Sequence, residues 1–310
     1  MTYAAAPEQY TEIAFRALDV DAANLALGHE TFEACGATFV RNRAYPLIYD
    51  ANHVAAISAS TPEEIDRLLA RVEREYDHTA HREFGIDFRT PPAFVARLLL
   101  EGFERRDSLV MVLNGELRAR PPDIEIRRVQ TEDDWRDYAA LRELDWREHE
   151  RRIKKAPEPA VGESLYSVAR LKQPPVQYWF ACLKGRPLAY FNSWAGIDGV
   201  GQVEDLFTHP KFRHQGLATA LIHHCVLECR HNGAGPVVIV ADPTDTPKQM
   251  YAAMGFRPIA VYSHYLKRLP KTQRSRQLRS APVGATPRAD NRSRSLTQAA
   301  ARFARRFWML

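Results

Sequence analysis

The segment from Val203 to Arg230 constrains the fold more than any other part of the chain, because it combines a strand, a tight basic turn and a helix. The turn has the pattern R-x-x-G-x-A, formed by Arg213, Gly216 and Ala218. The two small residues remove side-chain bulk where the helix begins, so a ligand can come close to the backbone. The first amide groups of a helix have no intrahelical partner and lie at the positive end of its dipole. Together with Arg213, they predict a cradle for a diphosphate.

The turn fits neither a Walker A loop, which requires G-x-x-x-x-G-K, nor a dinucleotide-binding loop, which requires G-x-G-x-x-G. Taken alone, it could equally be a surface turn before an amphipathic helix. A second motif follows between Ala241 and Ala260, where a helix carries Y-x-x-x-G-F. In this order and at this separation, the two motifs resemble those of the GNAT superfamily of acetyl-coenzyme A-dependent N-acetyltransferases. The signature of that family, Q/R-x-x-G-x-G/A, follows a strand and opens a helix.

The resemblance implies a binding site for acetyl-CoA, the expected co-substrate. In the family the loop binds the diphosphate, and this role then falls to seven consecutive residues: Arg213, His214, Gln215, Gly216, Leu217, Ala218 and Thr219. The strand before the loop binds the pantetheine arm and the thioester through its backbone, which here implies Leu206, Phe207 and Thr208. The second motif begins with Asp242 where the family usually has asparagine, which leaves coenzyme A contacts there open.

Two side chains are the expected acid and base. Tyr251 lies four residues before Gly255, where the family has the tyrosine that protonates the coenzyme A thiolate; a phenol is neutral at pH 7 and can donate a proton. Glu204 lies where many GNAT enzymes have a glutamate facing the active site, and it is the first choice as general base. Asp205 is expected on the opposite face of the strand, because side chains alternate. Asp205 and His209 remain alternatives for the base.

Residues 119–269 predict one complete catalytic α/β domain. A strand from Ile124 to Val129 precedes a helix that Thr131 caps and that ends near Leu144. A hairpin, a further strand, the helix after the turn, a buried strand and a helix from Pro247 complete the order, before closing strands. The GNAT fold has this order: a mixed, mostly antiparallel central sheet flanked by helices.

Residues 1–118 predict a degenerate domain of the same kind. Glu83 to Leu113 repeats the order strand, Thr-Pro, helix, Gly-Phe, strand that is found from Val238 to Leu266. The helix before it lacks R-x-x-G-x-A and has Glu63 and Glu64 in its first turn, where carboxylates would repel a diphosphate. This domain is expected to support folding, form a homodimer or line the substrate site.

The charge distribution argues against a nucleic-acid partner for most of the chain. The net charge is +5, but ten basic residues and one acidic residue lie beyond Pro270, so residues 1–270 are mildly acidic. Residues 270–310 form a basic tail that is expected to be disordered and could contact RNA, an anionic membrane surface or a protein partner. With 45% hydrophobic and 26% charged residues, the composition is that of a soluble protein.

No apolar run is long enough to span a membrane and the N-terminus lacks the layout of a signal peptide, so a cytoplasmic location is the default expectation. Cys225 and Cys229 lie one helical turn apart near three histidines, but their spacing fits no common zinc motif. The four cysteines are therefore expected to be buried, reduced thiols, and no metal is expected.

The predicted function is transfer of an acetyl group from acetyl-CoA to a primary amine, by direct attack on the thioester. The acceptor would be a small molecule or a peptide. The alternative is a non-catalytic module of GNAT fold that senses acyl-CoA or binds RNA or a protein partner. Fold alone does not identify the acceptor.

Overall fold

The structure, a computed structural model of the chain, describes residues 7–118, 120–154, 156 and 158–270. The predicted tail therefore lies outside the described residues, except for Pro270. The chain divides into two compact units, each built from two segments: unit 1 comprises residues up to Asn24 and Leu109–Ala260, and unit 2 comprises Leu25–Ser108 and the residues from Val261 onward.

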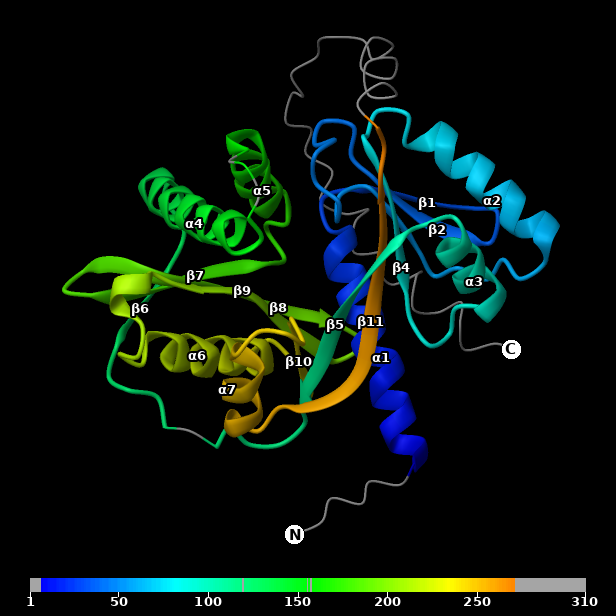
Figure 1. Cartoon of the computed structure of the whole chain (residues 1–310). Helices are drawn as coiled ribbons and strands as arrows, with labels where there is room; N and C mark the ends of the chain where they lie inside the picture. Colours follow the sequence, from blue (N-terminus) through cyan, green and yellow to red (C-terminus); the bar gives the residue numbers. More distant parts are fainter. Residues whose placement is uncertain (1–6, 119, 155, 157, 271–310) are drawn as a thin grey trace. The chain divides into compact units, whose positions relative to one another are not determined.

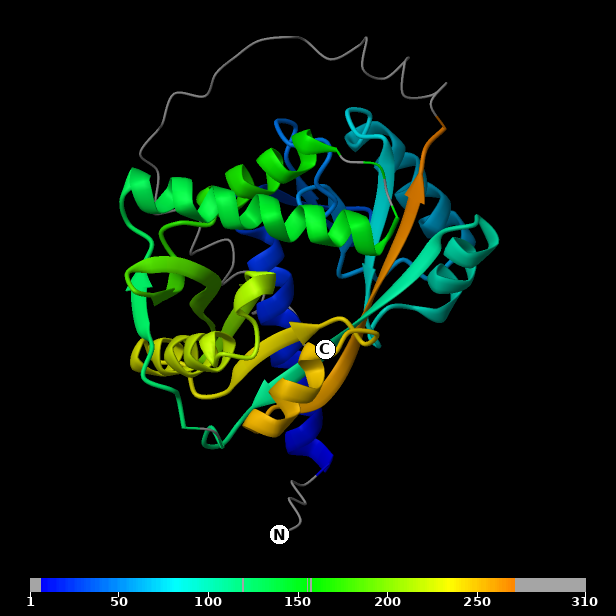
Figure 2. The same cartoon turned by 60° about the vertical axis from the view of Figure 1, so that its left-hand side comes forward.

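Unit 1 is a mixed sheet with helices on both faces. Figure 1 shows α4 and α5 on one face of β7, β8 and β9, and α6 on the other; in Figure 2 α4 and α5 lie side by side. The helices are α1 (Pro7–Ala26, except its last turn), α4 (Glu132–Arg152), α5 (Pro159–Leu171), the 3₁₀ turn η1 (Pro210–Phe212), α6 (Leu217–His231) and α7 (Pro247–Met254). The strands are β6 (Glu125–Arg128), β7 (Gln177–Leu183), β8 (Arg186–Ile197), β9 (Val200–Thr208) and β10 (Val237–Ala241), with parts of β5 (Glu104–Leu113) and β11 (Arg257–Arg268).

The strand directions in unit 1 confirm the predicted fold class. The order is β5, β10, β9, β8, β7, β6. β9 and β10 run parallel, whereas the neighbours on either side pair antiparallel. Under α6 the core is aliphatic, with fully buried Val203, Leu221 and Val226. Under α4 it is aromatic, because Tyr138 and Tyr178 meet edge to face at 5.3 Å.

Most helix ends fall where local sequence places them. Thr131 forms a capping box with Asp134 at the start of α4, and α7 runs from Pro247 to a C-cap at Gly255 with φ +112°. α4 continues to Arg152, past its predicted end near Leu144. α1 was not among the predicted elements.

Unit 2 repeats part of this topology. Its elements are β1 (Glu30–Ala34), β2 (Ala37–Arg41), β3 (His53–Ala55), α2 (Pro62–Glu75), β4 (His81–Ile86) and α3 (Pro92–Leu100), with the remaining parts of β5 and β11. The order is β1, β2, β3, β4, β11, β5, and only β3 and β4 are paired parallel among the pairings described. The run β2-β3-β4-β11 thus has the same strand directions as β8-β9-β10-β5 in unit 1.

Each of the two long strands, β5 and β11, pairs with a strand of the other sequence repeat. Leu109–Leu113 of β5 pair with β10 in unit 1, whereas Ser263–Arg268 of β11 pair with β4 in unit 2. The observed division therefore differs from the boundary predicted between residues 118 and 119. α1 belongs to unit 1 and the end of β11 to unit 2. Each repeat thus obtains one strand of its sheet from the end of the other repeat in sequence.

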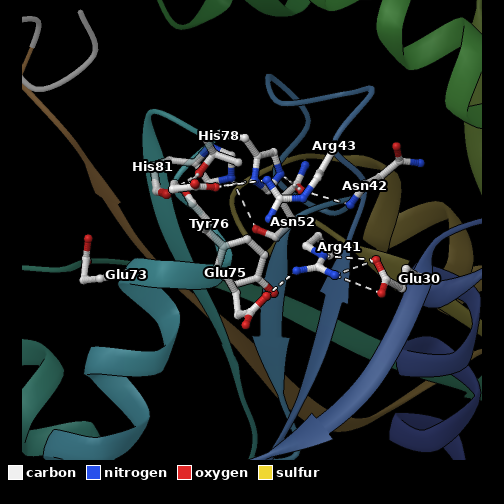
Figure 3. Close-up of polar contacts among 12 residues, drawn as sticks. Glu30, Arg41, Asn42, Arg43, Asn52, Glu73, Glu75, Tyr76, His78 and His81 are labelled. Carbon is white, nitrogen blue, oxygen red and sulfur yellow. Dashed lines mark hydrogen bonds and ion pairs between the residues drawn. The ribbon is translucent and has the colours of Figure 1, made fainter. Parts of the chain in front are cut away.

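Unit 2 also contains a dense polar network around Asn52, drawn in Figure 3. The Asn52 side chain accepts hydrogen bonds from the Asn42 amide (3.0 Å) and from His78 Nε2 (2.9 Å), and donates to the carbonyl of Tyr45 (2.9 Å). Tyr76 donates its hydroxyl proton to the carbonyl of Val40 (2.8 Å). These bonds hold the loop before β3 in place.

In the part of the chain that the structure describes, no helix combines the length and the apolar character needed to cross a membrane.

Candidate active site

The N-terminus of α6 requires glycine at position 216. Gly216 is the N-cap, with φ +83° and ψ −3°, a left-handed conformation that other residues adopt at a cost. A Cβ added there would lie 2.6 Å from Cγ of Pro122. Gly216 offers no capping side chain, so the amides at the start of the helix are not capped by it.

The predicted cradle residues offer mainly backbone groups. Leu217 is fully buried in the core, while Ala218 and Thr219 are half-buried. His214 and Gln215 are exposed in the turn, and His214 has φ +62°. The apolar side chain of Leu217 therefore packs inward, while the polar residues of the turn lie at the surface.

The Arg213 guanidinium is turned towards α4. It donates a hydrogen bond to Glu148 Oε2 (2.7 Å) and another, from Nε, to the carbonyl of Thr208 (3.2 Å). Both side chains of the ion pair are partly exposed, Arg213 at 42% and Glu148 at 33%. A diphosphate at α6 would therefore compete with Glu148 for Arg213.

β9 and β10 separate beside this turn. Their parallel pairing ends at Val203 and Ile239, and the β8–β9 register shifts between Glu204 and Phe207. Asp205 is the bulged residue, with φ +60°. A cavity of about 200 Å³ lies where the strands part, and its lining includes Phe191, Glu204, Asp205, Leu206, Asp242 and Tyr251.

The prediction that Asp205 points to the opposite face from Glu204 is wrong, because both line this cavity. The bulge inserts one residue and breaks the alternation of side chains. Asp205 accepts from Asn192 Nδ2 (3.4 Å) and pairs with Arg142 Nη1 of α4 (3.2 Å). Burial alone would raise the pKa of Asp205, but Arg142 and Lys172 outweigh it and hold that pKa below its ordinary value.

Glu204 is held by a neutral partner. Gln202 Nε2 donates to Glu204 Oε1 (2.7 Å) and also to Asp21 Oδ1 of α1 (2.8 Å). Gln202 is fully buried, and its Oε1 has no hydrogen-bond partner within the described residues. Ionised Glu204 and Asp21 can only accept hydrogen bonds, so Gln202 must direct its NH₂ group to both of them. Sequence reasoning missed Asp21 because it lies far from Glu204 along the chain.

Tyr251, on α7, lines the same cavity as Glu204. Its side chain is buried, and its hydroxyl has no hydrogen-bond partner among the residues that the structure describes. Burial, together with the charge of Asp245, raises the pKa of Tyr251 above its ordinary value. The phenol is therefore protonated at pH 7.

One stripe of α4 contacts all parts of this region. Asp145 accepts from the hydroxyl of Tyr190 (2.7 Å), and Arg152 donates to Asp245 in the loop before α7. Arg142 and Glu148 lie on the same stripe and contact Asp205 and Arg213 as described above. Sequence reasoning missed the last two turns of this stripe, because it ended the helix near Leu144.

His209 caps η1 instead of lining the cavity: its Nδ1 accepts from the amide of Lys211 (3.2 Å), and its ring lies against Phe212. Cys182, Cys225 and Cys229 are buried free thiols, as predicted, and burial raises the pKa of each. Cys35 is exposed, so the prediction of a buried thiol is wrong there.

Residues 138–256 match the sequence model of the acetyltransferase (GNAT) family. This range includes Glu204, the predicted cradle and Tyr251. No curated protein sequence matches the chain significantly.

Several solved structures share the fold. A GCN5-related N-acetyltransferase from Kribbella flavida has a TM-score of 0.60 at 16% identity, covering 83% of this chain and 94% of that chain. A functionally unknown conserved protein from Staphylococcus epidermidis has a TM-score of 0.60 at 17% identity, covering 78% of this chain and 95% of that chain. A tandem GNAT protein from the clavulanic acid biosynthesis pathway has a TM-score of 0.50 at 14% identity, covering 70% of this chain and 75% of that chain.

Proposed function

Because residues 138–256 match the sequence model of the GNAT acetyltransferase family, we propose that the chain transfers an acetyl group from acetyl-CoA to a primary amine by direct attack on the thioester. The observation that supports this most is that Glu204 and Tyr251 line one cavity, at the point where β9 and β10 separate. A carboxylate and a protonated phenol around one gap are the base and the acid that such a transfer requires.

The cofactor would be bound mainly by backbone groups. The amides of Leu217, Ala218 and Thr219 at the start of α6 would bind the diphosphate, and Arg213 would add a positive charge once it exchanges Glu148 for the ligand. His209 donates its amide proton to β8, so by alternation the Thr208 amide points to the side that β10 vacates. That open edge of β9 is available to the pantetheine arm.

Glu204 suits the role of base better than Asp205. Asp205 is bound by Arg142 and has a lowered pKa, which makes it a weaker proton acceptor. Glu204 accepts the proton of the acceptor ammonium, directly or through water. The free amine then attacks the thioester carbon: the C–N bond forms, the C–S bond breaks, and the leaving thiolate takes the proton of Tyr251. The new amide nitrogen releases its second proton, which returns through water to Tyr251, and Glu204 releases the first proton to solvent.

The charges around the cavity favour a cationic acceptor. Four carboxylates line it, and those of Asp205 and Asp245 are paired with arginines of α4. Glu204 accepts a hydrogen bond from Gln202, and Asp242 accepts from the amide and the hydroxyl of Thr244; these donors are neutral and leave the negative charge of both carboxylates in place. An ammonium group, on a small molecule or a peptide, is the partner that this charge attracts.

The test is release of free thiol from acetyl-CoA by the full chain, with a panel containing a polyamine, an aminoglycoside and a peptide with a free N-terminus. The proposal predicts amine-dependent release that is lost in Glu204→Gln and Tyr251→Phe. Binding of acetyl-CoA without turnover on any amine would favour the sensing module. Absence of binding would refute both readings.

Gln202 offers a sharper test of the base. Gln202→Leu removes a donor to the carboxylate at similar size, so kcat should fall roughly tenfold and the acidic limb of the pH profile should move up. Asp21→Asn removes a neighbouring negative charge, so the same limb should move down. Damage to the fold alone would not move the limb in opposite directions. Identical profiles in both variants and the wild type would assign the base elsewhere.

A further inference from the structure

A cluster of ionisable groups lies on one face of the sheet in unit 2. Val54, Phe84 and Tyr265 belong to the core that packs with α2 and α3. Because side chains alternate along a strand, His53, Glu83 and His264 lie on the opposite face. Asp50 joins them from the loop before β3. The cluster therefore comprises Asp50, His53, Glu83 and His264.

The groups are close enough to share one ion. Asp50, Glu83 and His264 each offer one ligand atom, and these three atoms lie within 4.8 Å of one another. They come from a loop, from β4 and from β11. Asp50 is exposed and Glu83 is buried, so the cluster leads from the surface inward.

Glu83 is incompletely satisfied. Its Oε1 is 2.9 Å from His264 Nδ1, but its Oε2 is buried and has no hydrogen-bond partner within the described residues. The Glu83 side chain is only 5% exposed. Burying a carboxylate oxygen without a hydrogen-bond donor costs free energy. His264 contacts Oε1 only, so a cation beside Oε2 would remove this cost.

We propose that Asp50, Glu83 and His264 bind one zinc ion, with solvent completing the coordination. Two carboxylates and one imidazole match zinc, which accepts both nitrogen and oxygen ligands, whereas magnesium and calcium prefer oxygen ligands alone. The two carboxylates together balance the charge of a divalent ion. The ion would give the orphaned oxygen of Glu83 its partner.

The neighbouring His53 is compatible with a bound cation. Its Nδ1 is 2.8 Å from the carbonyl of Asp50, which anchors the loop that carries this ligand. Binding requires a neutral His264, so affinity should weaken in acid.

The experiment is calorimetric titration of the full, untagged chain with zinc chloride at pH 7.5, after treatment with a chelator. We expect one zinc ion per chain, and a dissociation constant at least about tenfold higher in His264→Ala and in Asp50→Ala. His231→Ala is the matched control, because this exposed histidine lies on α6 in unit 1 and should leave the affinity unchanged.

Asp50→Ala keeps the test valid if His264→Ala does not fold, because Asp50 is exposed in a loop. Thermal unfolding provides a second measurement: at a zinc concentration near the dissociation constant of the wild type, zinc should raise the Tm of the wild type and the control clearly more than that of Asp50→Ala. The proposal is overturned by an absence of zinc binding, by equal affinity in Asp50→Ala and the wild type, or by equally tight binding of magnesium.

Discussion

Replacing Gly216 by alanine should weaken coenzyme A binding, because the substitution disturbs the turn before α6. The left-handed conformation at φ +83° costs an alanine about 1–2 kcal/mol. Its Cβ would also lie 2.6 Å from Pro122, so the turn or the proline must move, at a further cost of about 1–3 kcal/mol. Moving the turn shifts the amides that are proposed to bind the diphosphate.

The loss of affinity can be estimated from those amides. A hydrogen bond to a charged group is worth about 1.5–3 kcal/mol, so losing one of them should raise the Kd roughly 10- to 150-fold. Isothermal titration of the full chain with coenzyme A measures this value. Thermal unfolding of the same samples measures the stability change separately.

Gly233→Ala is the matched control for this experiment. Gly233 follows the other end of α6, has φ +95°, and an added Cβ would meet no atom within 4 Å. It carries the same conformational penalty without disturbing the turn, so the Kd should not change. The reasoning is refuted if Gly216→Ala binds coenzyme A as tightly as the wild type, or if Gly233→Ala weakens binding equally.

Three further predictions follow from the contacts of single side chains. Glu148→Gln frees Arg213 from a half-exposed pair worth about 0–1 kcal/mol, so the Kd for coenzyme A should fall up to about fivefold; unchanged or weaker binding would contradict this. Tyr251→Phe removes a hydroxyl without a hydrogen-bond partner in the described residues, so steady-state kinetics should show kcat reduced about 100-fold or more with little change in Tm. Burial lowers the pKa of His78 and of His81 to about 4, from about 6.5 when unfolded, so stability is complete above pH 6.5 and is lost as the pH falls towards 4. Denaturant unfolding should show about 2 kcal/mol less stability per histidine at pH 5 than at pH 7, and equal values would show that these rings are not buried as neutral groups.

Local signals in the sequence predicted the elements around the site. Thr131 and Pro247 mark the starts of two helices by capping and by backbone preference, and the structure confirms both. Lys184 and Gly185 form the predicted hairpin turn, and both have positive φ. These features depend on a few neighbouring residues, so a single sequence contains them.

The bulge at Asp205 could not be predicted in the same way. Alternation of side chains along a strand is the only guide that a sequence offers, and it assigns Asp205 to the face opposite Glu204. The extra residue in β9 depends on how β8 and β10 pair with it. The choice between the two carboxylates as base therefore needed their observed partners, Arg142 and Gln202.

Pairing between strands far apart in the sequence was the second feature that the sequence did not predict. The exchange of β5 and β11 between the repeats depends on contacts between strands far apart in sequence, which propensities do not report. For the same reason, the contribution of α1 through Asp21 was not foreseen. The sequence repeat was visible, but the strand partners of each copy were not.

The central claim is that the start of α6 binds the diphosphate of a coenzyme A thioester, while the gap between β9 and β10 receives its reactive end. A crystal structure of the full chain with acetyl-CoA tests it most directly. The account predicts diphosphate oxygens about 3 Å from the amides of Leu217, Ala218 or Thr219, and the thioester sulfur beside the hydroxyl of Tyr251. A diphosphate bound elsewhere, or a thioester remote from Tyr251 and Glu204, would contradict it.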